Sequence, residues 1–134
     1  MREAKLVQEI VIEDVDRIGV VADISRLLGD MGISLSAVTA NVEGDSVRIH
    51  LITSSQSYAR DALRDAGYTV RERDVLTIEL PHHPGFLCRI TEALARRELT
   101  ITELYATVPE DGETGLVVFS CSNNLYALQL LRGH

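Results

Sequence analysis

Residues 12–40 of this chain read IEDVDRIGVVADISRLLGDMGISLSAVTA, and residues 78–106 read IELPHHPGFLCRITEALARRELTITELYA. The two stretches align at a constant offset of 66 residues. Identical pairs include Ile12 and Ile78, Gly19 and Gly85, Ile24 and Ile90, Leu28 and Leu94, and Ala40 and Ala106. A repeat of this kind indicates one structural unit present twice, and a duplicated unit favours a binding function over catalysis.

The bulk composition limits the classes of function. The chain has 134 residues, a formal net charge of -7 and a sequence pI of about 5.0. Nucleic-acid-binding domains carry a basic patch, and no cluster of Lys and Arg is present, so we do not expect nucleic acid as a partner. No apolar run approaches the roughly 18 residues of a membrane span, and residues 1–10 do not resemble a signal peptide. We therefore expect a soluble, cytoplasmic protein with reduced, buried cysteines at Cys88 and Cys121.

The hydrophobic pattern predicts the order of elements within each repeat. Apolar residues recur at helical spacing after each repeated glycine, and alternating apolar residues with turn signals between them predict strands. The first repeat is predicted as strand 5–12, helix 19–31, strand 33–42, strand 47–51, helix 55–66 and strand 68–80. Residues 68–80 are predicted to pass almost directly from that last strand into the first strand of the second repeat. The second repeat continues with helix 85–97, strand 99–108, strand 116–121 and helix 123–131. This β-α-β-β-α-β order is the ferredoxin-like arrangement, an α+β fold with antiparallel sheets and helices on one face.

The second repeat is predicted to lack its last strand, because the sequence stops at His134. We place domain 1 at residues 1–73 and domain 2 at residues 74–134, and expect an uncovered sheet edge or a strand borrowed from another chain. In each repeat the apolar residues of the second predicted strand change from odd-numbered to even-numbered positions partway along it, which we call the parity switch. A partly apolar second sheet face, which we favour, or a bulge at Ser36-Ala37 and Thr102-Glu103 would explain the switch.

The motifs D-R-I-G at 16–19 and H-H-P-G at 82–85, each followed by a helix and then by G-I-S-L or E-L-T-I, resemble the ACT domain family. The resemblance covers essentially the whole chain in two copies and implies a stand-alone tandem ACT protein. It further implies a regulatory, allosteric module that binds an amino acid. The first repeat has Ile18 where the family's turn often has proline, and the second has His82-His83 in place of Asp-Arg. The two sites are therefore not expected to be equivalent.

Glycine before a helix allows a ligand to approach the backbone, and the first helical N–H groups suit a carboxylate. In the first repeat we place these donors at Gly19, Val20 and Val21, with Asp16 and Ser34 as acceptors for a ligand ammonium. The second-repeat candidates, which form the weaker site, are His83, Gly85, Phe86 and Leu87. The same glycines also suit a tight strand-to-helix turn without any ligand.

Signatures of catalysis are absent: the sequence has no nucleophile elbow, P-loop, dinucleotide-binding or zincin motif. We therefore expect no enzyme activity, no cofactor and no metal, although His82-His83 leaves a metal-binding sensor as the least favoured alternative. The carboxylates, among them Glu9 and Glu13, are interpreted as a solvated face. The predicted function is an amino-acid-binding regulatory protein that forms a homodimer. The alternatives are a dimerisation module without a ligand and a regulatory subunit of a separate amino-acid biosynthetic enzyme.

Overall fold

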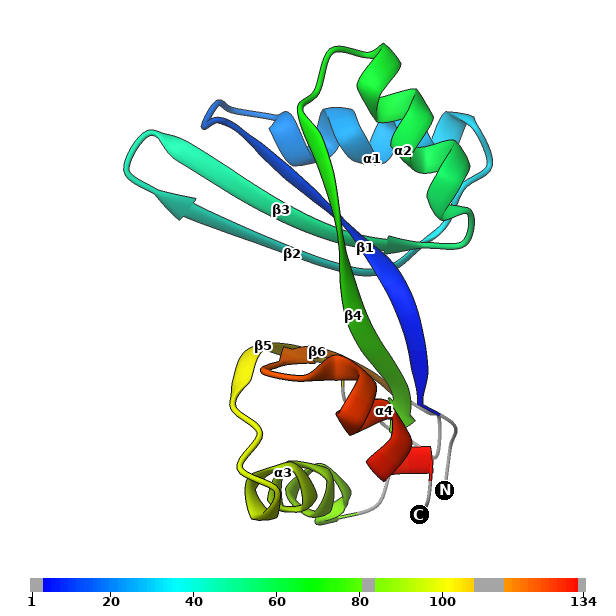
Figure 1. Ribbon diagram of the computed structural model, residues 1–134. Helices are drawn as coiled ribbons and strands as arrows, with labels where there is room; N and C mark the ends of the chain where they lie inside the picture. The colour runs from blue at the N-terminus through cyan, green and yellow to red at the C-terminus, as the bar shows by residue number, and fades with distance from the viewer. Residues whose placement is uncertain (1–3, 81–83, 108–114, 133–134) are drawn as a thin grey trace. The chain divides into compact units, whose positions relative to one another are not determined.

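The computed structural model describes residues 4–80, 84–107 and 115–132, and they form a mixed α+β fold (Figure 1). The strands are β1 (Lys5–Val15), β2 (Leu35–Glu43), β3 (Ser46–Thr53), β4 (Val70–Leu80), β5 (Ile101–Ala106) and β6 (Gly115–Cys121). The helices are α1 (Val20–Asp30), α2 (Gln56–Asp65), α3 (Phe86–Arg96) and α4 (Asn124–Arg132). No helix of the described residues is long and apolar enough to cross a membrane. The predicted fold class, two ferredoxin-like units in tandem, is confirmed.

One compact unit comprises Gln8–Arg73. Its strands lie in the order β2-β3-β1-β4, and β3 pairs antiparallel with both β1 and β2. Ile49 of β3 lies opposite Ile12 on one side and Ala40 on the other. Helices α1 and α2 lie on one face of these strands (Figure 1). The buried core contains Ile10, Ile12, Val20, Ile24, Leu28, Ile33, Val47, Ile49, Leu51, Ala59, Leu63 and Val70.

The other compact unit comprises Asp74–His134 together with Met1–Val7. Its strand order is β5-β6-β4-β1, so the start of β1 occupies the place of the strand that follows α4 in a complete ferredoxin-like unit. The start of β1 lies beside β4 in Figure 1, and Ala4 is fully buried in the core of this unit with Leu76, Ile78 and Phe119. The start of β1, which belongs to the first repeat, thus serves as a strand of the second unit.

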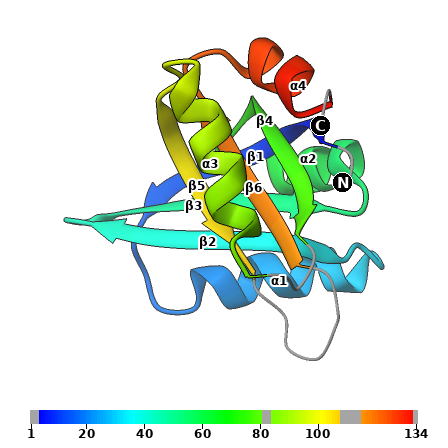
Figure 2. The same ribbon diagram turned by 90° about the horizontal axis from the view of Figure 1, so that it is seen from below.

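Helices α3 and α4 of this unit carry the same pattern of buried residues as α1 and α2. Ile90 and Leu94 of α3 and Ala127 and Leu131 of α4 are buried against the strands. Figure 2 shows α3 running alongside β5 and β6. A buried residue at every fourth position is the stripe expected of a helix that covers one sheet face.

The parity switch within β2 and β5 has a local cause. The register shifts between Leu35 and Ala37 in β2, and between Ile101 and Glu103 in β5. These shifts are the bulges named as the alternative to an apolar second face, and an extra residue at a bulge exchanges the faces of the side chains that follow. The face opposite the helices nevertheless also buries apolar residues, since Val11 and Val118 are almost completely inaccessible.

One amide side chain at the start of α2 and one at the start of α4 make equivalent hydrogen bonds. In α2, the Gln56 side-chain oxygen accepts a hydrogen bond from the Thr53 amide at 2.8 Å, and its nitrogen donates to the Gln8 carbonyl. In α4, the Asn124 oxygen accepts from the Cys121 amide at 2.9 Å, and its nitrogen donates to the Asp74 carbonyl at 3.1 Å. Each amide therefore ties the strand that precedes its helix to the first strand of its repeat.

Two expectations about single residues were wrong. Glu9, interpreted as part of a solvated face, is 0% exposed and lies 2.9 Å from His50 Nδ1, with Arg73 Nε 3.4 Å from the same carboxylate oxygen. Cys88, expected to be buried, is exposed, whereas Cys121 is buried as expected. Burial of a carboxylate requires such partners, and the sequence around Glu9 does not identify them.

Candidate functional site

The turn between β1 and α1 is the first candidate site. Asp16 and Gly19 are exposed, and Gly19 adopts a left-handed conformation with φ +87° directly before the helix. A Cβ built at Gly19 would meet no atom within 4 Å, so the glycine is required there by the backbone angle and not by crowding. The Asp16 amide donates to the Asp45 carbonyl at 2.7 Å, which fixes the turn to the β2–β3 hairpin.

The start of α1 offers unpartnered backbone donors. The first helical hydrogen bond is from the Asp23 amide to the Gly19 carbonyl at 2.9 Å. The Val20 amide makes only a long contact of 3.4 Å with the Arg17 carbonyl, and the amides of Val21 and Ala22 donate to no described residue. Val20 itself has a buried side chain, whereas that of Val21 is partly exposed. The turn therefore presents N–H groups and a positive dipole end, the two features that suit a carboxylate.

Charged side chains surround this turn. Arg17 Nη1 donates to Asp23 Oδ2 at 2.8 Å, and its Nη2 donates to the Tyr68 hydroxyl at 3.3 Å. The hydrogen bond that Arg17 donates to Asp23 raises the already high pKa of Arg17 more than partial desolvation lowers it, so the guanidinium is charged at all physiological pH values. Tyr68 lies 51 residues from Arg17 along the chain, so no sequence motif groups Tyr68 with Arg17 and Asp23.

Ser34 lies at the other end of α1. It precedes β2, and its backbone amide and carbonyl are both bonded to Ser54, at 3.1 and 2.9 Å. The helix has 11 residues, and a rise of about 1.5 Å per residue separates its two ends by roughly 16 Å. Gly19 and Ser34 of the same unit are therefore too far apart to contact one small ligand together.

The turn before α3 repeats the backbone geometry of the first. Gly85 has φ +85°, and the Arg89 amide donates to its carbonyl at 3.0 Å. Phe86 and Leu87 follow as the first helical residues, both half-buried. His83 lies outside the described residues. No acidic residue occurs in the first turn of α3, where α1 has Asp23.

The fold and the two glycine turns define a pair of small ferredoxin-like modules, each with an open strand-to-helix turn. A model of the ACT domain pair matches residues 5–131, and the chain belongs to this family. The resemblance inferred from the two glycine turns is thus confirmed over nearly the full sequence.

Solved structures show the same fold. The chain is similar to protein BT0572 from Bacteroides thetaiotaomicron, with a TM-score of 0.88 at 24% identity over 97% of this chain and 89% of that one. It is also similar to the ligand-free regulatory subunit of aspartate kinase from Thermus thermophilus, with a TM-score of 0.64 at 17% identity over 97% and 95% of the two chains. A structure of aspartokinase alpha and beta subunits gives a TM-score of 0.63 at 16% identity, over 98% and 95%. A comparison with curated protein sequences found no match.

Proposed function

We propose that this protein is a regulatory module that binds a free amino acid at the β1–α1 turn. The observation that carries the proposal is the open turn itself. Left-handed Gly19 precedes the Val20 amide, whose hydrogen bond to the Arg17 carbonyl is long, and the amides of Val21 and Ala22, which have no partner among the described residues. A ligand carboxylate would accept hydrogen bonds from the amides of Val20 and Val21. The exposed Asp16 carboxylate would accept from the ligand ammonium.

Ser34 enters this proposal as a contact from another unit. Because α1 separates it from Gly19 of its own unit, Ser34 would meet a ligand only where two units share one site. An amino acid held in that way would favour one arrangement of units over another, and a bound partner would sense the change. The second-repeat turn, with Gly85, Phe86 and Leu87, would provide a separate and weaker site.

The regulatory role is supported by the kind of protein that shares the fold. Two of the similar structures are described as a regulatory subunit of aspartate kinase and as aspartokinase alpha and beta subunits. By extension, we propose that this chain has no catalytic activity of its own, acts in the cytoplasm and regulates a separate amino-acid biosynthetic enzyme. We also propose a homodimer, to be tested by light scattering after gel filtration. The substitute strand at Lys5–Val7 removes one of the reasons for expecting that dimer.

The test is a thermal-shift and calorimetric screen of the whole protein against the twenty amino acids. Binding to the folded state alone raises the midpoint of unfolding. Gly19→Ala would place a methyl group beside the ligand carboxylate and weaken binding at least tenfold. Gly67→Ala is the matched control, because Gly67 is also exposed, has φ +95° and has no neighbour within 4 Å of a Cβ. Both variants carry the same backbone strain, so only loss of a ligand contact separates them.

Two outcomes would contradict this proposal. If no amino acid shifts the midpoint, the turn is structural only. If Gly19→Ala and Gly67→Ala weaken binding equally, the loss reflects strain, and the ligand is bound elsewhere.

A second candidate function is protein contact at the same turn without a ligand. Its support is the apolar surface there: Ile18 is 102% and Val15 is 68% exposed, relative to the reference side chains. In addition, Asp23 in the first turn of α1 opposes the approach of a carboxylate. Under this alternative, Ile18→Asp would abolish association with a partner such as aspartate kinase in gel filtration. Gly19→Ala would leave that association intact.

A further inference from the structure

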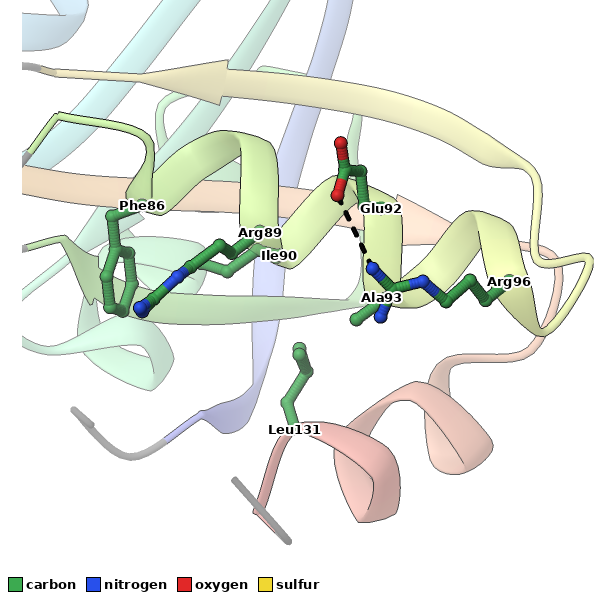
Figure 3. Close-up of a pocket in the computed structure, with 7 residues that line it drawn as sticks. All are labelled: Phe86, Arg89, Ile90, Glu92, Ala93, Arg96 and Leu131. Atoms are coloured by element: carbon green, nitrogen blue, oxygen red, sulfur yellow. Dashed lines mark hydrogen bonds and ion pairs between the residues drawn. The ribbon is translucent and has the colours of Figure 1, made fainter.

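A hollow of about 650 Å³ lies between α3 and α4 (Figure 3). Its apolar part is formed by Phe86, Ile90 and Ala93 of α3 and by Leu131, which points from α4 toward α3. Arg89 and Arg96 extend along α3 toward its start and form the charged part, with Glu92 between them. The volume falls within the range of roughly 300–1,000 Å³ typical of small-molecule sites.

The equivalent helices of the first repeat pack together instead. Helices α1 and α2 contact each other, whereas the backbones of α3 and α4 come close at fewer positions within the described residues. At the offset of 66 residues, Ala93 stands where α1 has Leu27, and Leu27 packs against the core of its unit. Replacing a branched side chain by a methyl group removes the atoms that would fill such a space. The hollow therefore follows from a specific difference between the two repeats.

The charges on α3 and on the equivalent helix α1 also differ, because two acidic positions of α1 are basic in α3. Arg89 and Arg96 stand where α1 has Asp23 and Asp30. Arg96 Nη2 lies 3.5 Å from Glu92 Oε2, in a pair whose side chains are both mostly exposed. Arg89 forms no ion pair with a described residue, and so the hollow keeps one uncompensated positive charge in a protein whose net charge is -7. An exposed cation beside an apolar pocket is complementary to a molecule with one anionic group and an apolar body.

We propose that the hollow between α3 and α4 binds a monocarboxylic acid with an apolar chain. The carboxylate accepts hydrogen bonds from the Arg89 guanidinium, whose planar fork can bind both oxygens. The chain lies over Phe86 and Ala93, which are partly exposed, above the buried side chains of Ile90 and Leu131. It removes the exposed apolar surface of Phe86 and Ala93 from water. This hollow is separate from the proposed amino-acid site at the β1–α1 turn, because it needs neither Gly19 nor Asp16. It shares Phe86 with the weaker candidate site at the turn before α3.

The test uses octanoate as the probe, below its micellar concentration, in titration calorimetry with the full chain. Octan-1-ol serves as the neutral analogue of equal chain length and should bind at least tenfold more weakly. Arg89→Gln should weaken octanoate binding about tenfold or more, since a hydrogen bond between two charged groups is stronger than one between neutral groups. Ala93→Leu places the residue of the first repeat in the hollow and should abolish binding.

Arg97→Gln is the matched control for charge. Arg97 follows α3 and donates to the Tyr126 hydroxyl at 3.4 Å, but it does not line the hollow. This variant should retain octanoate affinity within twofold. The proposal is overturned if octanoate does not bind, if octan-1-ol binds equally well, or if Arg89→Gln has no larger effect than Arg97→Gln. Amino-acid binding at the β1–α1 turn, measured as the part that Gly19→Ala removes, should remain unchanged in the Ala93→Leu variant. A failure of this proposal is therefore distinguishable from a failure of the proposed function.

Discussion

Replacing Glu98 by glycine should stabilise the protein. Glu98 is the one non-glycine residue with a left-handed backbone among the described residues, at φ +59°. It occupies the position that ends α3, where its amide donates to the Ala95 carbonyl at 2.9 Å and the Leu99 amide donates to the Leu94 carbonyl at 3.1 Å. These two hydrogen bonds define a Schellman cap, which usually has glycine at this position.

The first repeat provides the comparison within the same molecule. At the equivalent position α1 ends in Gly32, with φ +73° and hydrogen bonds of 3.0 and 2.9 Å in the same pattern. A side chain in the left-handed region costs about 1–2 kcal/mol, whereas glycine adds about 0.5–1 kcal/mol of chain entropy to the unfolded state. The difference predicts a net gain of about 0.5–1 kcal/mol for Glu98→Gly. The Glu98 side chain pairs with no described residue, so no contact is lost.

The assay is urea unfolding followed by circular dichroism, with thermal unfolding as a second measurement. A gain of this size should raise the thermal midpoint by about 3 °C for a chain of this length. Glu98→Ala is the control, because it removes the same charge but keeps the Cβ that causes the strain. Gly32→Ala should lower stability by about 1 kcal/mol. Equal midpoints for Glu98→Gly and Glu98→Ala would refute the argument, since the backbone angle would then have no cost.

Two further predictions concern the second unit. Asn124→Ala should destabilise the protein by about 1–3 kcal/mol, because it removes the hydrogen bonds to the Cys121 amide and the Asp74 carbonyl. Urea unfolding that matches wild type would contradict this. The pKa of the Cys88 thiol is raised, and the largest cause is the hydrogen bond of 3.3 Å that the thiol donates to Glu92. Glu92→Gln should therefore lower the pKa of Cys88 and speed its alkylation by iodoacetamide at pH 8 several-fold. Mass spectrometry resolves Cys88 from buried Cys121, and an unchanged pH profile of Cys88 alkylation would refute the role of Glu92.

Much of the fold could be predicted because its signals are local. The offset of 66 residues, the helical stripe of Val20, Ile24 and Leu28, and the glycine before each helix lie within short windows of sequence. The family membership inferred from these windows is confirmed over residues 5–131. The predicted strand 5–12 extends in the structure to Val15, a difference at an element boundary, where local patterns are least informative.

The site was only partly predictable, for a reason visible in single residues. Asp16, Gly19, Val20 and Val21 are adjacent in sequence, so their proximity in the turn needed no tertiary information. Ser34 was grouped with them by motif, yet an 11-residue helix holds it away from Gly19 in its own unit. The bond from Arg17 to Tyr68 joins residues that only folding brings together.

The sequence by itself determined the duplicated β-α-β-β-α-β order, the helices and the left-handed glycine turns, because each depends on residues a few positions apart. Only the tertiary structure decided that Ala4 fills the core of the second unit, that Glu9 is buried beside His50, and that a hollow separates α3 from α4. Those outcomes depend on which strand pairs with which and on how two helices fill the space between them. Strand pairing and packing join residues that are distant in sequence. Hydrophobic periodicity identifies the buried face of a helix or strand, but it does not identify the element that packs against that face.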